Sequence, residues 1–234
     1  MKRSQINSSI ETAINVFKHF GLNLPPFAFW TVNDWDKKGK EVDEIRKAGL
    51  GWDVTDFGQG NFELIGRTLF TLRNAYKQDG NHSKVYSEKF ILDPPRQHAP
   101  LHFHRSKMED IINRAGGNVL ITVYKATPDG KCSDETFTIQ IDGQTVELKP
   151  GAVVRLEPGQ SICLRPYIIH SFCGEEGTGI EINGVQYTVS GEVSSVCDDW
   201  NDNCFLDPVE RFPTIEEDEP RKYYLCNEYP EAML

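Results

Sequence analysis

The pattern of apolar and polar positions divides the chain into a helical beginning and a longer part with the texture of β-strands. In residues 8–20, Ile10, Ile14 and Phe17 recur at the spacing of one helix face, which predicts an amphipathic helix. Gly21 can close this helix with a left-handed cap, and the two prolines that follow prevent its continuation. We expect this helix to pack against the rest of the protein and to carry no chemistry.

A second helix is expected over residues 35–47, where Val42 and Ile45 stand among charged residues. Residues 51–58 are bounded by glycines and are rich in acids and aromatic residues. This composition predicts a connecting loop, although aromatic rings beside carboxylates would also suit a polyol ligand. Residues 62–76 are apolar, and their spacing does not decide between helix and strand.

Short apolar runs separated by glycine, proline and aspartate begin near residue 84. The runs cover residues 85–92, 99–104, 118–126, 136–141, 145–148, 152–156, 161–164, 168–173, 179–182 and 185–189. The Asp142-Gly143 pair between two of these runs is typical of a tight β-hairpin. Many short strands at this spacing predict an all-β sandwich or barrel.

Three regions follow from this pattern. A barrel is expected over residues 85–204, with an N-terminal helical extension, residues 1–84, and a C-terminal tail, residues 205–234, both packed on the barrel. The acidic run at residues 216–219 is expected to form a solvated face of the tail. The N-terminal extension has more apolar surface than one barrel needs, which favours a homodimer.

Composition narrows the class of partner. The 25 Lys and Arg stand against 35 Asp and Glu, which gives a formal net charge of −10 and argues against nucleic acid, whose partners need a basic face. No segment approaches the roughly 18 apolar residues of a membrane span. The basic start of the chain has no apolar run behind it, so we expect no signal peptide and a cytoplasmic protein. The six cysteines form no C-x-x-C pair and are expected to be reduced thiols without bound zinc.

His102 and His104 are the strongest chemical signal in the chain. Alternate residues of a strand face the same side, so the two imidazoles would stand together. Glu109 follows a polar run suited to a turn and can fold back beside them. His170 is flanked by apolar residues, which suits either a core histidine or a ligand from a distant strand. Together these four side chains predict a site for one divalent transition metal.

Two stretches resemble the paired motifs of the cupin family. The first reads His102-x-His104-x4-Glu109-x6-Gly116, and the second, looser one reads Gly159-x6-Pro166-x3-His170. The second departs from the family pattern, because it lacks the glycine two residues after the proline and has Gly174 in place of the closing asparagine. The resemblance covers about residues 85–190 and implies a cupin double-stranded β-helix, which is a jelly-roll barrel.

A narrower resemblance is to the D-lyxose isomerases. It is carried by Tyr-Ser-Glu-Lys at residues 86–89, by residues 102–104 and 107–114, by Gly116-Gly117, and by residues 191–199. Cys197 stands where that family usually has asparagine. The resemblance implies a divalent metal, usually manganese, and the interconversion of D-lyxose with D-xylulose and of D-mannose with D-fructose. The expected partner is therefore a free sugar.

The residues fit this chemistry, in which a hydrogen moves between the first two carbons of an open-chain sugar. Three imidazoles and one carboxylate leave two positions of an octahedral metal free for two sugar oxygens, so the metal would stabilise an enediolate. Hard oxygen donors and six-fold coordination favour Mn²⁺, although zinc and cobalt would also bind such a set.

Proton transfer also needs a base, and Glu192 is our candidate because it follows Gly191 at the end of the last strand region. Lys107 and Lys89 are the cations that we expect to steady developing negative charge. Further candidates, for contacts with sugar hydroxyls, are Asp198, Asp199 and Arg211.

Three alternatives remain open at this point. A cupin phosphosugar isomerase would need clustered basic or hydroxyl groups near the metal, and no dense basic cluster adjoins the motif strands. An iron(II) oxygenase uses two histidines and one carboxylate, and a fourth ligand leaves less room for oxygen and substrate. A sugar-binding cupin without turnover would not need Glu192 and Lys107; incubation with Mn²⁺ and D-lyxose separates it from an isomerase.

Overall fold

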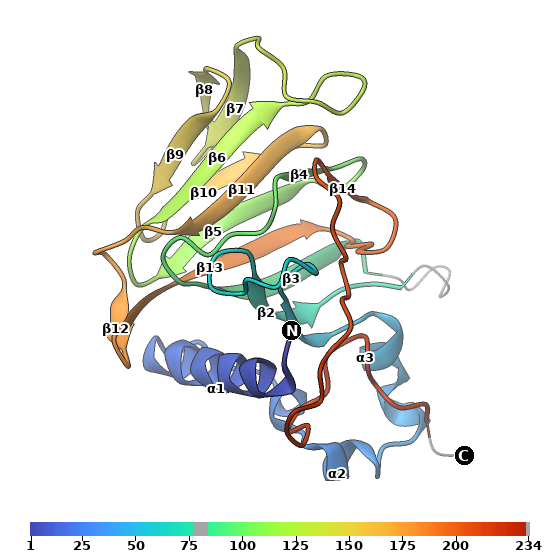
Figure 1. Ribbon diagram of the computed structural model, residues 1–234. Helices are drawn as coiled ribbons and strands as arrows, with labels where there is room; N and C mark the ends of the chain where they lie inside the picture. The colour runs from blue at the N-terminus through green and yellow to red at the C-terminus, as the bar shows by residue number, and fades with distance from the viewer. Residues whose placement is uncertain (77–83, 233–234) are drawn as a thin grey trace.

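The computed structural model describes residues 1–76 and 84–232, and its strands form two antiparallel sheets (Figure 1). The larger sheet has the order β1 (Gly51–Thr55), β2 (Arg67–Arg73), β3 (Tyr86–Asp93), β13 (Val185–Ser195), β5 (Glu109–Ala115), β10 (Ser161–Leu164), β7 (Phe137–Ile141) and β8 (Gln144–Leu148), with β12 (Ile180–Ile182) paired to β13. The smaller sheet has the order β14 (Asn203–Phe205), β4 (His102–His104), β11 (Ile168–Gly174), β6 (Val119–Lys125) and β9 (Ala152–Leu156). Apolar side chains of both sheets form one buried core, with Ile111 and Ile162 from the larger sheet and Ile121 and Leu156 from the smaller. The predicted all-β cupin barrel is confirmed.

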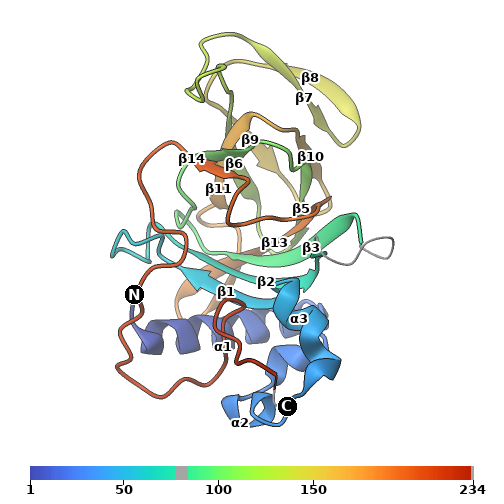
Figure 2. The ribbon, with the colours of Figure 1, turned by 90° about the vertical axis from the view of Figure 1, so that its right-hand side faces the viewer.

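Helices cover one end of the larger sheet (Figure 2). They are α1 (Arg3–His19), η1 (Pro26–Phe29), α2 (Val32–Trp35), η2 (Lys40–Val42) and α3 (Asp43–Lys47). Ile6, Ile10 and Phe17 of α1 are fully buried in a cluster with Trp52 of β1 and Phe90 of β3. The helix predicted over residues 8–20 is thus present and begins earlier, at Arg3. Because the apolar face of α1 is covered by its own chain, it no longer argues for a second copy, and the homodimer stays a prediction.

The helix expected over residues 35–47 is interrupted. It consists of the end of α2, then η2, then the short α3, with Gly39 in an extended conformation between the first two. Inside a helix, a glycine lowers the stability of the helix by about 1 kcal/mol relative to an alanine. The apolar spacing therefore marked the right region, but the prediction of one continuous helix is wrong.

The loop predicted over residues 51–58 is also wrong, because residues 51–55 form β1. All five are buried: Trp52 and Val54 pack in the cluster with α1, while Asp53 and Thr55 line a pocket. The ambiguous residues 62–76 contain β2, which pairs with β1 and β3. The N-terminal region therefore adds two strands to the larger sheet, besides its helices.

The C-terminal tail runs from β14 back to α1 (Figure 1). The Arg3 guanidinium is fully buried and donates hydrogen bonds to both Glu217 and Glu228. The next turns of α1 contact the same acidic run, since Ser4 donates to Asp218 and Asn7 to Glu219. Residues 216–218 are exposed, as expected of a solvated face, and these carboxylates also bind the positive end of α1.

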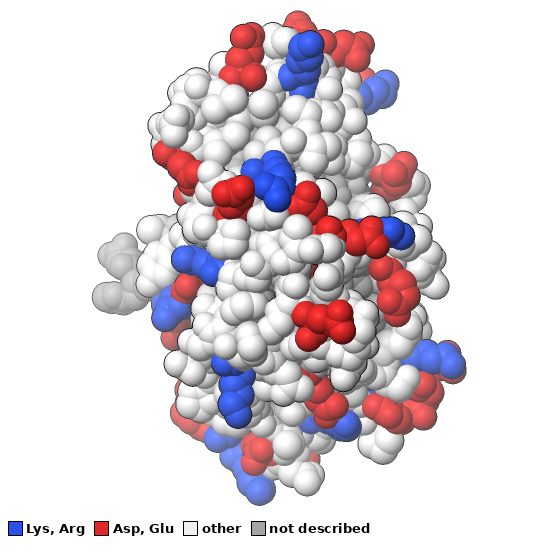
Figure 3. Space-filling view, turned by 90° about the vertical axis from the view of Figure 1, so that its left-hand side faces the viewer, with Lys and Arg blue, Asp and Glu red and all other residues white. Residues whose placement is uncertain are grey.

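The surface carries charges of both signs. On the face drawn in Figure 3, Lys and Arg side chains stand singly among acidic ones and form no continuous basic patch among the described residues. In the described part of the chain, no helix is both long and apolar enough to span a membrane.

Candidate functional site

Three histidines meet on the inner face of the smaller sheet. His102 and His104 lie two residues apart on β4 and face the same side, and His170 of β11 pairs directly with His102. Each histidine offers one ring nitrogen to a group whose members all lie within 4.8 Å of one another. Strand alternation thus places the first pair on one face, and the register between β4 and β11 adds the third histidine beside it.

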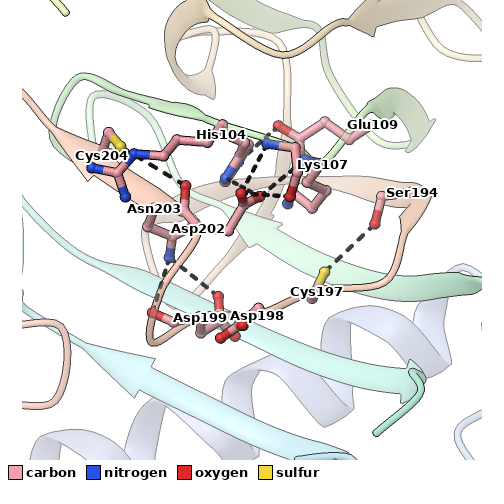
Figure 4. A network of polar contacts seen from close by, with 12 residues as sticks. His104, Lys107, Glu109, Ser194, Cys197, Asp198, Asp199, Asp202, Asn203 and Cys204 are labelled. Carbon is pink, nitrogen blue, oxygen red and sulfur yellow. Dashed lines mark hydrogen bonds and ion pairs between the residues drawn. The ribbon is translucent and has the colours of Figure 1, made fainter. Parts of the chain in front are cut away.

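Glu109 approaches these histidines from the other sheet, at the first residue of β5. Its Oε1 lies 3.0 Å from His170 Nε2 and 3.4 Å from His104 Nε2. Figure 4 shows His104, Lys107 and Glu109 converging on one place. The four predicted ligands therefore come together where the two sheets face each other.

The protonation of this group suits a cation. Nδ1 of His102 donates to the Pro100 carbonyl at 2.8 Å, and Nδ1 of His170 donates to the Ile168 carbonyl at 3.1 Å, so the lone pair of each ring is on Nε2. Burial, together with the neighbouring histidines, lowers the pKa of His102 well below its usual value and keeps the ring neutral.

Three buried polar atoms at this site lack a hydrogen-bond partner in the described part of the chain. Both ring nitrogens of His104 and Oε1 of Glu109 are buried and form no hydrogen bond with the described residues. A buried polar atom without a partner is costly, and a bound ion is one of its ordinary explanations. Neutral imidazoles with one ionised carboxylate are the donors that a divalent transition metal takes, so the residues present fit such an ion.

Glu192 lies on the inner face of β13, between Lys89 of β3 and Ile111 of β5. Lys107 Nζ donates to its Oε1 at 2.9 Å, and Lys89 Nζ lies 3.3 Å from its Oε2. Burial raises the pKa of Glu192, but the charges of Lys107 and Lys89 outweigh this and lower it to about 2. Lys107 Nζ is also 2.5 Å from Oε2 of Glu109, so one ammonium group joins both carboxylates.

Arg211 and Asp199 line the same pocket as the histidines and Glu192. Arg211 forms an ion pair with Asp53 of β1, and its Nη2 lies 3.6 Å from Oδ2 of Asp199. Asp198 does not line this pocket; its carboxylate accepts hydrogen bonds from the backbone and side chain of Asn201. Of the three predicted sugar contacts, two therefore reach the pocket.

Three further charged residues belong to the site. Arg67 and Asp202 were not predicted, whereas Asp53 lies in the stretch 51–58 whose carboxylates were considered for a polyol ligand. Asp53 and Arg67 line the pocket from β1 and β2, and Arg67 is held by an ion pair with Asp93 at 2.7 Å. Asp202 accepts hydrogen bonds from the backbone of Ser106 and Lys107, and its Oδ2 is 3.9 Å from His104 Nδ1. None of the three belongs to a recognisable motif. A prediction of a β-strand for residues 51–55 would have indicated that Asp53 faces the interior.

Comparison with known proteins identifies the family of this chain. A family model described as D-lyxose isomerase matches residues 1–229. A D-lyxose/D-mannose isomerase of Escherichia coli O157:H7 and another of Serratia proteamaculans are each 42% identical over 230 residues, which is 98% of this chain and 98% of each relative.

Solved structures agree on the fold. The L-ribose isomerase of Cellulomonas parahominis with L-psicose has a TM-score of 0.58 at 14% identity, over 92% of this chain and 98% of that chain. The L-ribose isomerase of Geodermatophilus obscurus has a TM-score of 0.59 at 15% identity over the same shares. Identity this low shows a shared fold and no more. The match of the family model and the 42% identity go further: this chain belongs to the D-lyxose isomerase family.

Proposed function

We propose that this protein interconverts D-lyxose with D-xylulose, and D-mannose with D-fructose, by proton transfer through an enediolate. The observation that carries the proposal is one pocket that holds an ionised, buried carboxylate, Glu192, beside the group of three histidines and Glu109. The names of the two bacterial relatives support the choice of sugars.

His102, His104, His170 and Glu109 would hold one divalent cation, for which we propose Mn²⁺. When bound, such an ion supplies a Lewis acid for the carbonyl and the adjacent hydroxyl oxygen of an open-chain sugar. Nitrogen donors alone do not select manganese; the single carboxylate and the oxygens of the sugar favour it over softer ions.

Glu192 would take the proton from the second carbon of the aldose. The C–H electron pair then forms the double bond between the first two carbons, and the π pair of the carbonyl moves to the first oxygen. Return of the proton to the first carbon, with transfer of the hydroxyl proton from the second oxygen to the first, gives the ketose. With a pKa of about 2, Glu192 is ionised at neutral pH but weakly basic, so the C–H bond must be strongly activated for it to act.

Lys107 and Lys89 would offset the negative charge that develops on the sugar oxygens. Both ammonium groups are buried beside Glu192, where a charge acts more strongly than it does in water. At the other end of the pocket, Asp53, Asp199 and Arg211 would contact the sugar hydroxyls, because an ion-paired cluster presents both donors and acceptors.

The cations of the pocket favour a free sugar over a phosphosugar. Among the described lining residues, each Lys or Arg is ion-paired to a carboxylate: Arg67 to Asp93, Lys89 to Glu192, Lys107 to Glu109 and Glu192, and Arg211 to Asp53. A phosphate clamp needs positive charge that is not already neutralised. A binding protein without turnover would have no use for the buried Glu192 carboxylate beside the histidine group.

A sugar panel tests this function. Metal-stripped and Mn²⁺-loaded protein would be incubated with D-lyxose, D-mannose, D-ribose and D-mannose 6-phosphate, and the ketoses quantified by chromatography. We expect D-xylulose and D-fructose from the loaded protein only. Turnover of the phosphate ester alone would establish the phosphosugar isomerase instead, and binding of D-lyxose without any ketose would establish the non-catalytic protein.

Chelation is expected to lower the melting temperature. A ligand that binds only the native state at 100 times its Kd adds about 2.7 kcal/mol, and for a chain of this size that corresponds to roughly 5–10 °C. Differential scanning fluorimetry with a chelator, and then with excess Mn²⁺, measures the shift. The His104→Ala variant is the control, since its melting curve should not respond to Mn²⁺; an unresponsive wild-type protein would contradict the metal site.

A further inference from the structure

We propose that Ser194 and Cys197 are positioning residues for Glu192: they hold its Oε1 so that Oε2 exchanges the proton with the sugar. The inference rests on the proposed function, in which Glu192 is the base. It adds which oxygen of the carboxylate reacts, and what keeps that oxygen in place.

The contacts of the Glu192 carboxylate are unequal. Oε1 accepts hydrogen bonds from Lys107 Nζ at 2.9 Å and from Cys197 Sγ at 3.2 Å. Ser194 Oγ lies 2.8 Å from both Oε1 and the Ser195 carbonyl, so its one proton is shared between these two acceptors. Within the described residues, Oε2 has one polar contact, Lys89 Nζ at 3.3 Å. Because a carboxylate oxygen has about two lone-pair sites, these donors together saturate Oε1, and Oε2 keeps accepting capacity.

The backbone of Cys197 is itself fixed by one buried side chain, the amide of Asn74. Cys197 N donates to Asn74 Oδ1 at 3.0 Å, and Asn74 Nδ2 donates to the carbonyls of Cys197 and Ala48, both at 3.1 Å. Asn74 therefore ties the segment after β13 to the residue that follows α3. These hydrogen bonds to both backbone groups of Cys197 fix the position from which its side chain reaches Glu192.

The thiol stays a donor under working conditions. Burial raises the pKa of Cys197, and the negative charge of Glu192 raises it further, so the sulfur keeps its proton and presents it to Oε1. Ser194 lies 3.5 Å from the same sulfur (Figure 4). The hydroxyl and the thiol thus approach one oxygen together, and their joint effect is to resist rotation of the carboxylate about its last bond.

Such control matters because proton transfer requires close approach of the reacting atoms. Reactive geometry keeps them about 3–3.5 Å apart, and a displacement of about 1 Å costs on the order of 100-fold in rate. Without Ser194 and Cys197, Lys107 and Lys89 would still neutralise Glu192, but the carboxylate could exchange its two oxygens. The loss should therefore fall on the chemical step and spare sugar binding.

The test compares Cys197→Ala, Ser194→Ala and the double variant on D-lyxose with saturating Mn²⁺. We expect kcat to fall about tenfold in each single variant and about 100-fold in the double one, with KM, metal content and melting temperature close to wild type. Cys197→Ser should recover part of the loss, because a hydroxyl also donates. Cys132→Ala is the matched control, because it changes the same residue type in a separate apolar cluster beside Ala126.

Two further measurements separate positioning from general damage. In the Glu192→Gln background, the double change should cost nothing more, since its effect passes through Glu192. A crystal structure of the double variant should show the Glu192 carboxylate rotated or in two orientations, and this readout needs no activity. If Cys197→Ala or the double variant does not fold, kcat is compared between wild type, Cys197→Ser and Ser194→Ala.

The outcomes distinguish failure of the positioning role from failure of the proposed isomerase function. Wild-type kcat in the double variant, or an undiminished loss in the Glu192→Gln background, would overturn the positioning role while leaving the isomerase intact. A wild-type protein that converts no sugar would overturn the proposed function; an unmoved carboxylate in the double variant would then reject the positioning role as well.

Discussion

Replacing His170 with alanine is expected to remove metal and activity together. The Nε2 atom of this histidine faces the donors of His102 and His104 and lies 3.0 Å from Glu109, so its loss leaves a buried site one ligand short. A bound metal supplies several kcal/mol of charge stabilisation, which corresponds to about 1000-fold in rate. Elemental analysis of the purified variant, with ketose formation from D-lyxose, measures both losses.

The His170→Ala variant is measured against two reference proteins. Melting of the His170→Ala variant is compared with metal-free wild-type protein, because loss of the ion lowers stability by itself. His19→Ala, at an exposed position on α1, is the matched control and should keep full metal and rate. Full occupancy and full rate in the His170→Ala protein would show that the four-ligand site is wrong.

Changing Glu192 to glutamine is expected to lower kcat strongly while the metal stays bound. A positioned base contributes about 10²–10⁴-fold, so kcat should fall within that range. The amide keeps the size of the side chain but leaves Lys107 and Lys89 without their shared anion, so some loss of stability accompanies it. Glu88→Gln, on the neighbouring strand β3, is the matched control for the change of charge.

Isomerisation in deuterium oxide distinguishes proton transfer from a hydride shift. Starting from the ketose, a carboxylate base exchanges its proton with solvent and delivers deuterium to the second carbon of the aldose. A hydride shift carries the hydrogen across intact and needs no carbon base. NMR of the aldose formed by the wild-type protein therefore reads the route directly. Absence of deuterium, together with normal turnover by Glu192→Gln, would remove Glu192 from the base role and favour the hydride shift.

The convergence of the predicted ligands was foreseeable because strand alternation is a local rule. It puts His102 and His104 on one face without any knowledge of the fold. His170 needed a further step, since its pairing opposite His102 depends on the register between β11 and β4. Glu109 was predicted to return beside the histidines after a turn, whereas the strand that it begins, β5, was missed. The inner positions of β5 are Glu109, Ile111 and Asn113, and two polar residues among three hide the usual alternation.

The wall opposite the histidines could not be predicted in this way. β1 is buried on both faces, against α1 and against the pocket, so it lacks the solvated face that makes a strand recognisable. The ion pair of Asp53 with Arg211 joins residues separated by most of the chain, and no spacing rule links them. The hydrogen bonds that hold Glu192 likewise depend on the path of the chain after β13.

The two residues of the ion pair between Asp53 and Arg211 emerge far apart in time during synthesis. The ribosome delivers the chain from its N-terminus at about 5–20 residues per second. The strands that carry His102, His104, Glu109 and His170 emerge well before the tail, whereas Arg211 appears only close to the end. A growing chain can therefore bring the three histidines and Glu109 together while Arg211, on one side of the proposed sugar pocket, is still missing. Under the proposed function, the groups that would select the sugar are then completed last.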